Sequence, residues 1–187
     1  MEIVEYGKVI SILGFKNVHI DNVDIFLKQI KSTAHPASAQ ILDAQHVAGK
    51  PHLLFAFLNA LKSHQSGQAI SKNLDMETLL YVSGSRQITR AIEMLGITPH
   101  TSTIALIIFA LTANEVKEAE NKITLLVPGS RDDTVLEVTN QEKYLNLMKT
   151  FGVTELEIKT VSGSGLSKYE TLTWLIVERV SLLSTKR

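Results

Sequence analysis

The chain has 187 residues, the length of one ordinary domain, which is enough to bury a core without disulfides or metals. It is 44% hydrophobic and 20% charged, and 19 lysines and arginines balance 19 aspartates and glutamates. This composition excludes intrinsic disorder and a global positive field, so any contact with a nucleic acid has to be local. The absence of cysteine excludes disulfides, thiolate zinc sites and cysteine nucleophiles.

The sequence predicts neither export nor a membrane span. Its longest apolar run, residues 104–111, is much shorter than the roughly 20 residues that a membrane helix needs. Acidic Glu2 and Glu5 stand where a secretory signal would need a basic stretch. We expect a cytoplasmic protein, also nuclear if its source is a eukaryote, and no composition shift divides residues 1–187 into more than a single domain.

The first half of the chain begins with strands. Residues 1–15 alternate and are rich in Ile and Val, which predicts a hairpin or two short strands. Asp21 or Asn22 can cap a helix that continues to about Ser32. Residues 39–44 predict another strand.

Three helices are predicted next. Pro51 suits the first position of a helix over residues 52–66, because its missing N–H would be unpaired there anyway. Residues 74–82 predict a second helix, and residues 86–95 a third with Ser85 as its N-cap. The buried stripe of the third helix is expected to comprise Ile88, Ala91, Ile92 and Leu95.

Residues 103–112 are apolar on both faces, as expected of a central strand in a sheet that is covered on both sides. A short charged helix over residues 114–121 follows. Residues 123–127 and 135–138 predict strands, and Pro128 with Gly129 a turn between them.

The last part of the chain is predicted to be mostly helical. Thr139 and Glu142 have capping-box spacing before a helix that Gly152 ends. Residues 156–161 predict a short strand, and residues 168–183 a final helix after a Gly- and Ser-rich loop. Core-facing residues are expected in the two helices at Tyr144, Leu145, Met148, Phe151, Leu172, Leu175, Ile176 and Val180.

Strands and helices are interleaved irregularly, and several neighbours are spaced as hairpins. We therefore predict an α+β fold with a single domain, built on a mixed, largely antiparallel sheet that carries helices on both faces.

No catalytic motif is complete. The loop at residues 162–168 lacks the glycine of a dinucleotide fingerprint and the Gly-Lys-Ser/Thr of a P-loop, and it also lacks the closing glycine of a nucleophile elbow. The six histidines match no metal-ligand spacing, so no metal and no cofactor are predicted. Asp43, His46 and His52 could converge at a strand end, although a loop aspartate more often caps the next helix.

The run Asp43-Ala44-Gln45-His46-Val47-Ala48-Gly49-Lys50-Pro51-His52-Leu53-Leu54-Phe55-Ala56 resembles the opening signature of a known family, the small PRPK-binding subunit of the KEOPS (EKC) tRNA-modifying complex. The similarity continues through Ala60-Leu61, Ile70-Ser71, Leu79-Leu80-Tyr81 and Gly84-Ser85-Arg86-Gln87-Ile88. It covers residues 39–96, nearly a third of the chain, and is weaker elsewhere.

The resemblance implies a non-catalytic subunit that binds the small kinase-like ATPase of the complex. The complex places a threonylcarbamoyl group on an adenosine beside the tRNA anticodon, and archaeal members of this subunit family are implicated in recruiting tRNA through its single-stranded 3′ CCA end. The implied partners are therefore the kinase-like ATPase subunit and tRNA, with no membrane and no metal.

The chemistry of the matched block is compatible with contact to tRNA. It combines five basic residues with few acidic ones, so a neutral protein can still carry a basic face here. Single-stranded ends are also held by stacking and by hydrogen bonds to base edges, for which Gln and His are suitable types. The candidate tRNA-binding residues are Lys50, His52, Lys62, Lys72, Arg86, Gln87 and Arg90.

Other interpretations stay open at this stage. Any one of these lysines can be ordinary solvated surface. A small-molecule-binding regulatory domain would need an apolar pocket with convergent polar groups. A hydrolase or transferase that uses Asp43 and His46 would need those side chains in hydrogen-bond contact within a cleft. For the kinase partner, we expect apolar side chains of the 52–66 helix and the long last helix to form the contact.

Overall fold

The computed structural model describes residues 2–3, 6–161 and 165–185, and it contains two compact units. Unit 1 comprises residues 1–44 and 96–135, and unit 2 comprises residues 45–95 and 136–187. The chain thus leaves unit 1 after residue 44 and returns to it at residue 96. The prediction that the whole chain is one domain stays a prediction.

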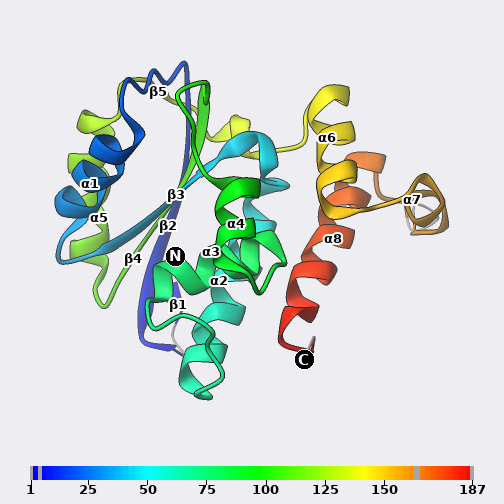
Figure 1. The fold of residues 1–187 in the computed structure, drawn as a ribbon, viewed down its shortest axis with the longest axis horizontal. Coiled ribbons are helices and arrows are strands. Elements are labelled where there is room, and N and C mark those ends of the chain that lie inside the picture. The colour runs from blue at the N-terminus through cyan, green and yellow to red at the C-terminus, as the bar shows by residue number, and fades with distance from the viewer. Residues whose placement is uncertain (1, 4–5, 162–164, 186–187) are drawn as a thin grey trace. The chain divides into compact units, whose positions relative to one another are not determined.

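Unit 1 contains an antiparallel sheet with the order β1-β2-β4-β3 (Figure 1). Strand β1 (Glu2–Ile3) forms the predicted hairpin with β2 (Lys8–Lys16), and the short β5 (Ser130–Arg131) pairs with the far end of β2. The central strand β4 (Thr103–Ala110) lies between β2 and β3 (Ser38–Asp43). The α+β class and the antiparallel sheet are therefore confirmed, and the 103–112 segment is central as predicted.

Helices α1 (Val23–Ala34) and α5 (Ala113–Leu126) pack side by side against this sheet (Figure 1). Asn22 caps α1 by accepting a hydrogen bond from the N–H of Ile25 at 3.0 Å. Apolar side chains of both helices form one core cluster with alternate residues of β2 and β4, and burial of this surface stabilises unit 1. The prediction that helices cover both faces of the sheet stays a prediction.

Unit 2 is helical. Its elements are α2 (Gly49–Gln65), α3 (Leu74–Ser83), α4 (Ile88–Leu95), α6 (Gln141–Phe151), α7 (Glu155–Val161) and α8 (Lys168–Ser181). Helix α8 packs against α2, α3, α6 and α7 and so runs through the middle of the unit (Figure 1). Leu172, Ile176 and Val180 of α8 join Tyr144, Leu147 and Met148 of α6 in a core cluster.

Three strand predictions are wrong. Residues 123–127 continue α5 to Leu126, because Ile123 lies on the same buried face as Val116 and Ala119. Residues 156–161 belong to α7, and residues 135–138 overlap a 3₁₀ turn over Asp133–Leu136. Short runs rich in Ile and Val do not by themselves distinguish a strand from the buried face of a helix.

Several helix starts are shifted. Helix α2 begins at Gly49, so Pro51 falls inside its first turn rather than at its first position. Helix α4 begins at Ile88 instead of Arg86. Asn140, and not Thr139, caps α6 by accepting from the N–H of Lys143 at 2.9 Å.

The predicted core faces are correct only in part. On α4, Ala91 and Leu95 are buried, whereas Ile88 and Ile92 are 41% and 49% exposed. On α6, Leu145 is exposed and Leu147 takes its place in the core. Gly152 ends α6 in the left-handed conformation (φ +65°), as predicted. None of the helices in the described part of the chain has the length and apolar character needed to span a bilayer.

Candidate functional site

The main candidate site is a cavity of about 430 Å³ in unit 2, beside the junction of α3 and α4. Gly84 ends α3 in the left-handed conformation, with φ at +61°. The hydroxyl of Ser85 then accepts a hydrogen bond from the N–H of Gln87 at 3.2 Å, which makes a tight turn rather than the expected helix cap. This turn leaves Arg86 and Gln87 exposed at the cavity wall, one turn before Arg90.

The cavity is suited to an anion on one side. Arg86, Gln87 and Arg90 line it, and none of the lining residues in the described part of the chain is acidic. Within the described residues, the guanidinium groups of Arg86 and Arg90 have no hydrogen-bond or ion-pair partner. Guanidinium groups bind phosphate oxygens in a bidentate manner, and a glutamine amide can bond to base edges. The structure therefore brings together three of the seven predicted residues in the lining of one cavity.

The cavity is also lined by Arg179 of α8, which is not among the predicted site residues. Its Nη1 donates to the carbonyl oxygens of Phe151 and Gly152 at 2.8 and 2.9 Å, and its Nη2 pairs with Glu157. Hydrogen bonds to Thr154, followed by the pairing with Arg179, hold the pKa of Glu157 below its usual value. Arg179 thus satisfies carbonyl groups at the C-terminus of α6 and is held in place by them. No local pattern around Arg179 indicates this role.

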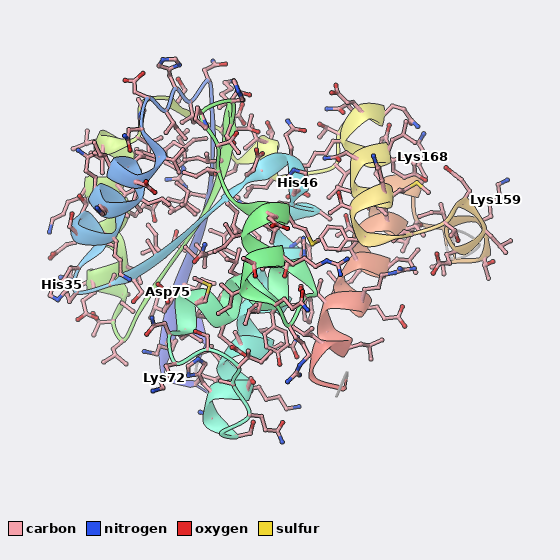
Figure 2. The ribbon with its side chains drawn as sticks, viewed as in Figure 1. His35, His46, Lys72, Asp75, Lys159 and Lys168 are labelled. Carbon is pink, nitrogen blue, oxygen red and sulfur yellow. The ribbon has the colours of Figure 1, made fainter. Side chains whose placement is uncertain are left out.

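Three predicted lysines are exposed but do not line the cavity: Lys50 and Lys62 on α2, and Lys72 before α3. Figure 2 shows Lys72 near Asp75, well away from Lys159 and Lys168, which project from the region of α7 and the start of α8. Lys72 is thus separated on unit 2 from the basic residues at the other end of the unit. The lysines have the exposure that a phosphate contact needs, and their role stays a prediction.

His52 is the exception among the seven residues, because it is 0% exposed. Its Nδ1 accepts a hydrogen bond from the N–H of Ala48 at 3.2 Å, and its Nε2 lies 2.9 Å from the carbonyl oxygen of Val82. The ring also meets Phe151 edge-on, with centroids 5.3 Å apart. A buried imidazole with both nitrogens engaged offers no atom to an external ligand, so we correct the prediction and leave His52 out of the interface.

These contacts fix the chemistry of His52. Because Nδ1 is an acceptor, the proton of the neutral ring must be on Nε2, where it is donated to Val82. Burial lowers the pKa of His52 to about 4, against a smaller opposing effect of the bond to Val82. His52 is therefore a neutral connector between α2 and α3.

A second cavity, of about 230 Å³, lies next to the first, and Arg86 and Leu183 line both. Its other lining residues include Ser63, Gln68 and Tyr81, together with Glu77 of α3. Glu77 is 0% exposed, an unusual position for a carboxylate.

The residues of the hydrolase alternative have other partners. The carboxylate of Asp43 accepts a hydrogen bond from the hydroxyl of Thr101 at 2.8 Å, within unit 1. His46 belongs to unit 2, where its Nδ1 lies 3.4 Å from the side-chain nitrogen of Asn146. No group of three His, Asp or Glu side chains within the described residues is arranged to hold a metal ion. The loop at residues 162–164 lies outside the described residues.

Comparisons with known proteins agree with the resemblance at residues 39–96. The family model described as "Kinase binding protein CGI-121" matches residues 15–184. The chain is 33% identical over 134 residues to the protein named "Regulatory protein Cgi121" of Methanocaldococcus jannaschii, an alignment that covers 72% of this chain and 79% of that protein. A match of this extent leaves only short ends of the chain outside it, and the protein therefore belongs to the CGI-121 family of kinase-binding proteins.

Proposed function

We propose that this protein is a non-catalytic subunit of a KEOPS complex. In this role it binds the kinase-like ATPase subunit and helps to recruit tRNA, through the 3′ CCA end, for threonylcarbamoyl modification of the adenosine next to the anticodon. The family's kinase-binding description and the regulatory name of the Methanocaldococcus jannaschii relative support the role of an accessory subunit.

The cavity at the α3–α4 junction carries the tRNA part of the proposal. Arg86, Arg90 and Gln87 line it with two guanidinium groups and one amide, and neither guanidinium has a hydrogen-bond or ion-pair partner within the described residues. Guanidinium groups neutralise backbone phosphates, whereas an amide can read a base that is not stacked in a duplex. A single-stranded end fits such a cavity better than a duplex does, because its bases are free to enter.

An exposed tryptophan, packed against a partly buried phenylalanine, supports the contact with the kinase-like ATPase. Trp174 of α8 is 45% exposed, and its ring meets that of Phe55 on α2 edge-on at 6.0 Å. Leu182, which follows α8, is 47% exposed. Large apolar side chains that remain accessible are typical of the centre of a protein interface, and tryptophan most of all.

The tRNA part is tested by titrating the purified protein with intact tRNA and with the same tRNA lacking its 3′ CCA end, at low and at moderate salt. We expect binding to require the CCA end and to weaken in Lys50→Ala, Lys72→Ala and Arg86→Ala. Lys159→Ala is the matched control, because Lys159 is equally exposed but lies well away from Lys72 (Figure 2). Equal binding of both tRNAs, or none, would overturn the tRNA part and leave the kinase contact.

The kinase part is tested by measuring the affinity of Trp174→Ala for the purified kinase-like ATPase subunit. Loss of a buried interface tryptophan typically weakens a complex by about 2 kcal/mol or more, a factor of roughly 30. Leu125→Ala removes a side chain on α5 that is 89% exposed, and it should leave the affinity unchanged. Unchanged affinity of Trp174→Ala would show that the contact lies elsewhere.

A further inference from the structure

One stripe of exposed side chains runs along α8 and just past its end. Its members are spaced four residues apart and therefore lie on one side of the helix: Glu170, Trp174, Glu178 and Leu182. Two carboxylates thus stand on this stripe, one helical turn before and one helical turn after the tryptophan of the proposed kinase contact.

The two carboxylates differ in what they do for the free protein. Glu170 Oε2 accepts hydrogen bonds from the hydroxyl and the N–H of Ser167, at 2.7 and 2.9 Å, and so forms a capping box at the start of α8. These bonds hold the pKa of Glu170 below its usual value. The carboxylate of Glu178, in contrast, has no hydrogen-bond or ion-pair partner within the described residues.

Glu178 is also in an unfavourable position for a negative charge. Helix α8 ends at Ser181, so Glu178 lies in its last turn, where the helix dipole disfavours a carboxylate. The neighbouring Arg179 does not compensate for it, because its guanidinium binds the end of α6 and pairs with Glu157. The stability of α8 therefore gives no reason for a charge at Glu178, whereas a cation supplied by a partner does.

The surface around Glu178 is held in place before any partner binds. Asn59 of α2 donates from Nδ2 to the carbonyl oxygen of Phe55 at 2.8 Å and to the hydroxyl oxygen of Ser181 at 3.3 Å, which ties α2 to the end of α8. Phe55 in turn meets the ring of Trp174 edge-on. A preorganised apolar centre loses little freedom on binding, and a charge beside it sets the orientation and the choice of partner.

We propose that Glu178 is a specificity-determining residue of the kinase contact, and that it pairs with a lysine or arginine of the kinase-like ATPase subunit when Trp174 becomes buried there. The assignment rests on the proposed function, because it takes the face of α8 around Trp174 as the kinase-binding surface. The partner then has to combine an apolar recess for the indole with a basic side chain about one helical turn away. A surface without that cation leaves Glu178 desolvated and unpaired, which selects against it.

Glu178→Gln tests the proposal because it removes the charge while keeping the size and nearly the same helix propensity. We expect two effects of opposite sign. The unfolding midpoint of the free protein should rise by roughly 1–3 °C, since the helix dipole no longer opposes a carboxylate. The affinity for the purified kinase-like ATPase subunit should fall roughly fivefold, mainly through slower association.

Two further variants bracket this result. Glu178→Lys places a like charge opposite the partner's cation, so it should weaken binding more than Glu178→Gln does. Glu142→Gln removes an exposed carboxylate from α6 and should leave the affinity unchanged.

The salt dependence of association gives an independent measurement. The association rate of the wild type should fall as the salt concentration rises, and that of Glu178→Gln should fall less steeply. Equal affinity and equal salt dependence of the two proteins would overturn the proposal. Weaker binding together with a lower unfolding midpoint would overturn it as well, because the carboxylate would then support the fold rather than the contact.

Trp174→Ala separates this proposal from the proposed function. If Trp174→Ala weakens the complex while both Glu178 variants bind like the wild type, the kinase contact through α8 stands and the selection by Glu178 fails. If none of these variants changes the affinity, the contact lies elsewhere and both proposals for this face of α8 fail.

Discussion

The imidazole of His52 on α2 donates its Nε2 proton to the carbonyl oxygen of Val82 near the end of α3, at 2.9 Å. The same ring accepts at Nδ1 from the N–H of Ala48, so it joins the start of α2 to α3 in one tautomer only. Because this arrangement requires a neutral ring, the connection depends on pH.

Stability should therefore fall in acid. Burial lowers the pKa of His52 to about 4, from 6.5 in an exposed histidine, so the unfolded state takes up the proton first as the pH falls. The stabilisation is fully present above the unfolded value and is lost between it and the folded value. When the pH is lowered from about 7.5 to 5, His52 alone should reduce the free energy of unfolding by roughly 2 kcal/mol.

Urea unfolding of wild type and His52→Gln at these two pH values measures this term. The variant should be less stable at neutral pH but should lack the part of the pH dependence that His52 contributes. His100→Gln changes an exposed histidine and is the control. Identical pH dependence of wild type and His52→Gln would contradict the prediction.

Arg179→Ala should destabilise unit 2. The guanidinium donates to the carbonyl oxygens of Phe151 and Gly152 and pairs with Glu157, and its side chain is 34% exposed. Water screens the ion pair, so most of the loss should come from the two carbonyl groups, roughly 1–3 kcal/mol in all. Thermal unfolding measures the loss. Arg90→Ala removes an exposed guanidinium that has no partner among the described residues, so it should change stability little.

Gly14→Ala should destabilise unit 1 by roughly 2–3 kcal/mol. A Cβ at Gly14 would lie 2.7 Å from the carbonyl oxygen of Asp132 and 2.8 Å from a methyl group of Val135, closer than real contacts allow. Gly7→Ala is the comparison, because its Cβ would meet nothing within 4 Å and only its positive φ of +56° is unfavourable. The Gly7 variant should lose about 1 kcal/mol. Equal unfolding midpoints for the two variants would disprove the steric argument.

Lys72→Gln should change the salt dependence of tRNA binding. A lysine that contacts a phosphate releases about one counterion on binding, so its removal lowers the slope of log affinity against log salt by about 1. Titrations at several salt concentrations give the slope. Lys159→Gln serves as the control, and a slope that is the same in wild type and Lys72→Gln would remove Lys72 from the proposed interface.

Much of the fold could be predicted because its signals are local. Asn22 caps α1 and Gly152 ends α6 as expected, since capping depends on a side chain and on backbone conformation within a few residues. The apolar run of β4 also predicted a central strand, because apolar residues on both faces of a strand are a signal within a few residues of sequence.

The errors arose where partners distant in sequence determine the structure. Helix α2 begins at Gly49, and the N–H of Lys50 in its first turn donates to Oε1 of Glu137, a residue distant in sequence, at 3.4 Å. The composition of residues 123–127 predicted a strand. Ile123 packs beside Val116 and Ala119 in the unit 1 core, and this packing keeps it helical.

The candidate site divides in the same way. The sequence by itself determined that Arg86, Gln87 and Arg90, three of the seven predicted residues, lie near one another, because residues this close in sequence stay close in any fold. Only the tertiary structure buried His52 and Glu77 and brought Arg179 of α8 into the lining of the same cavity. Burial and long-range hydrogen bonds depend on which helices pack together, and the residue types alone do not contain that information.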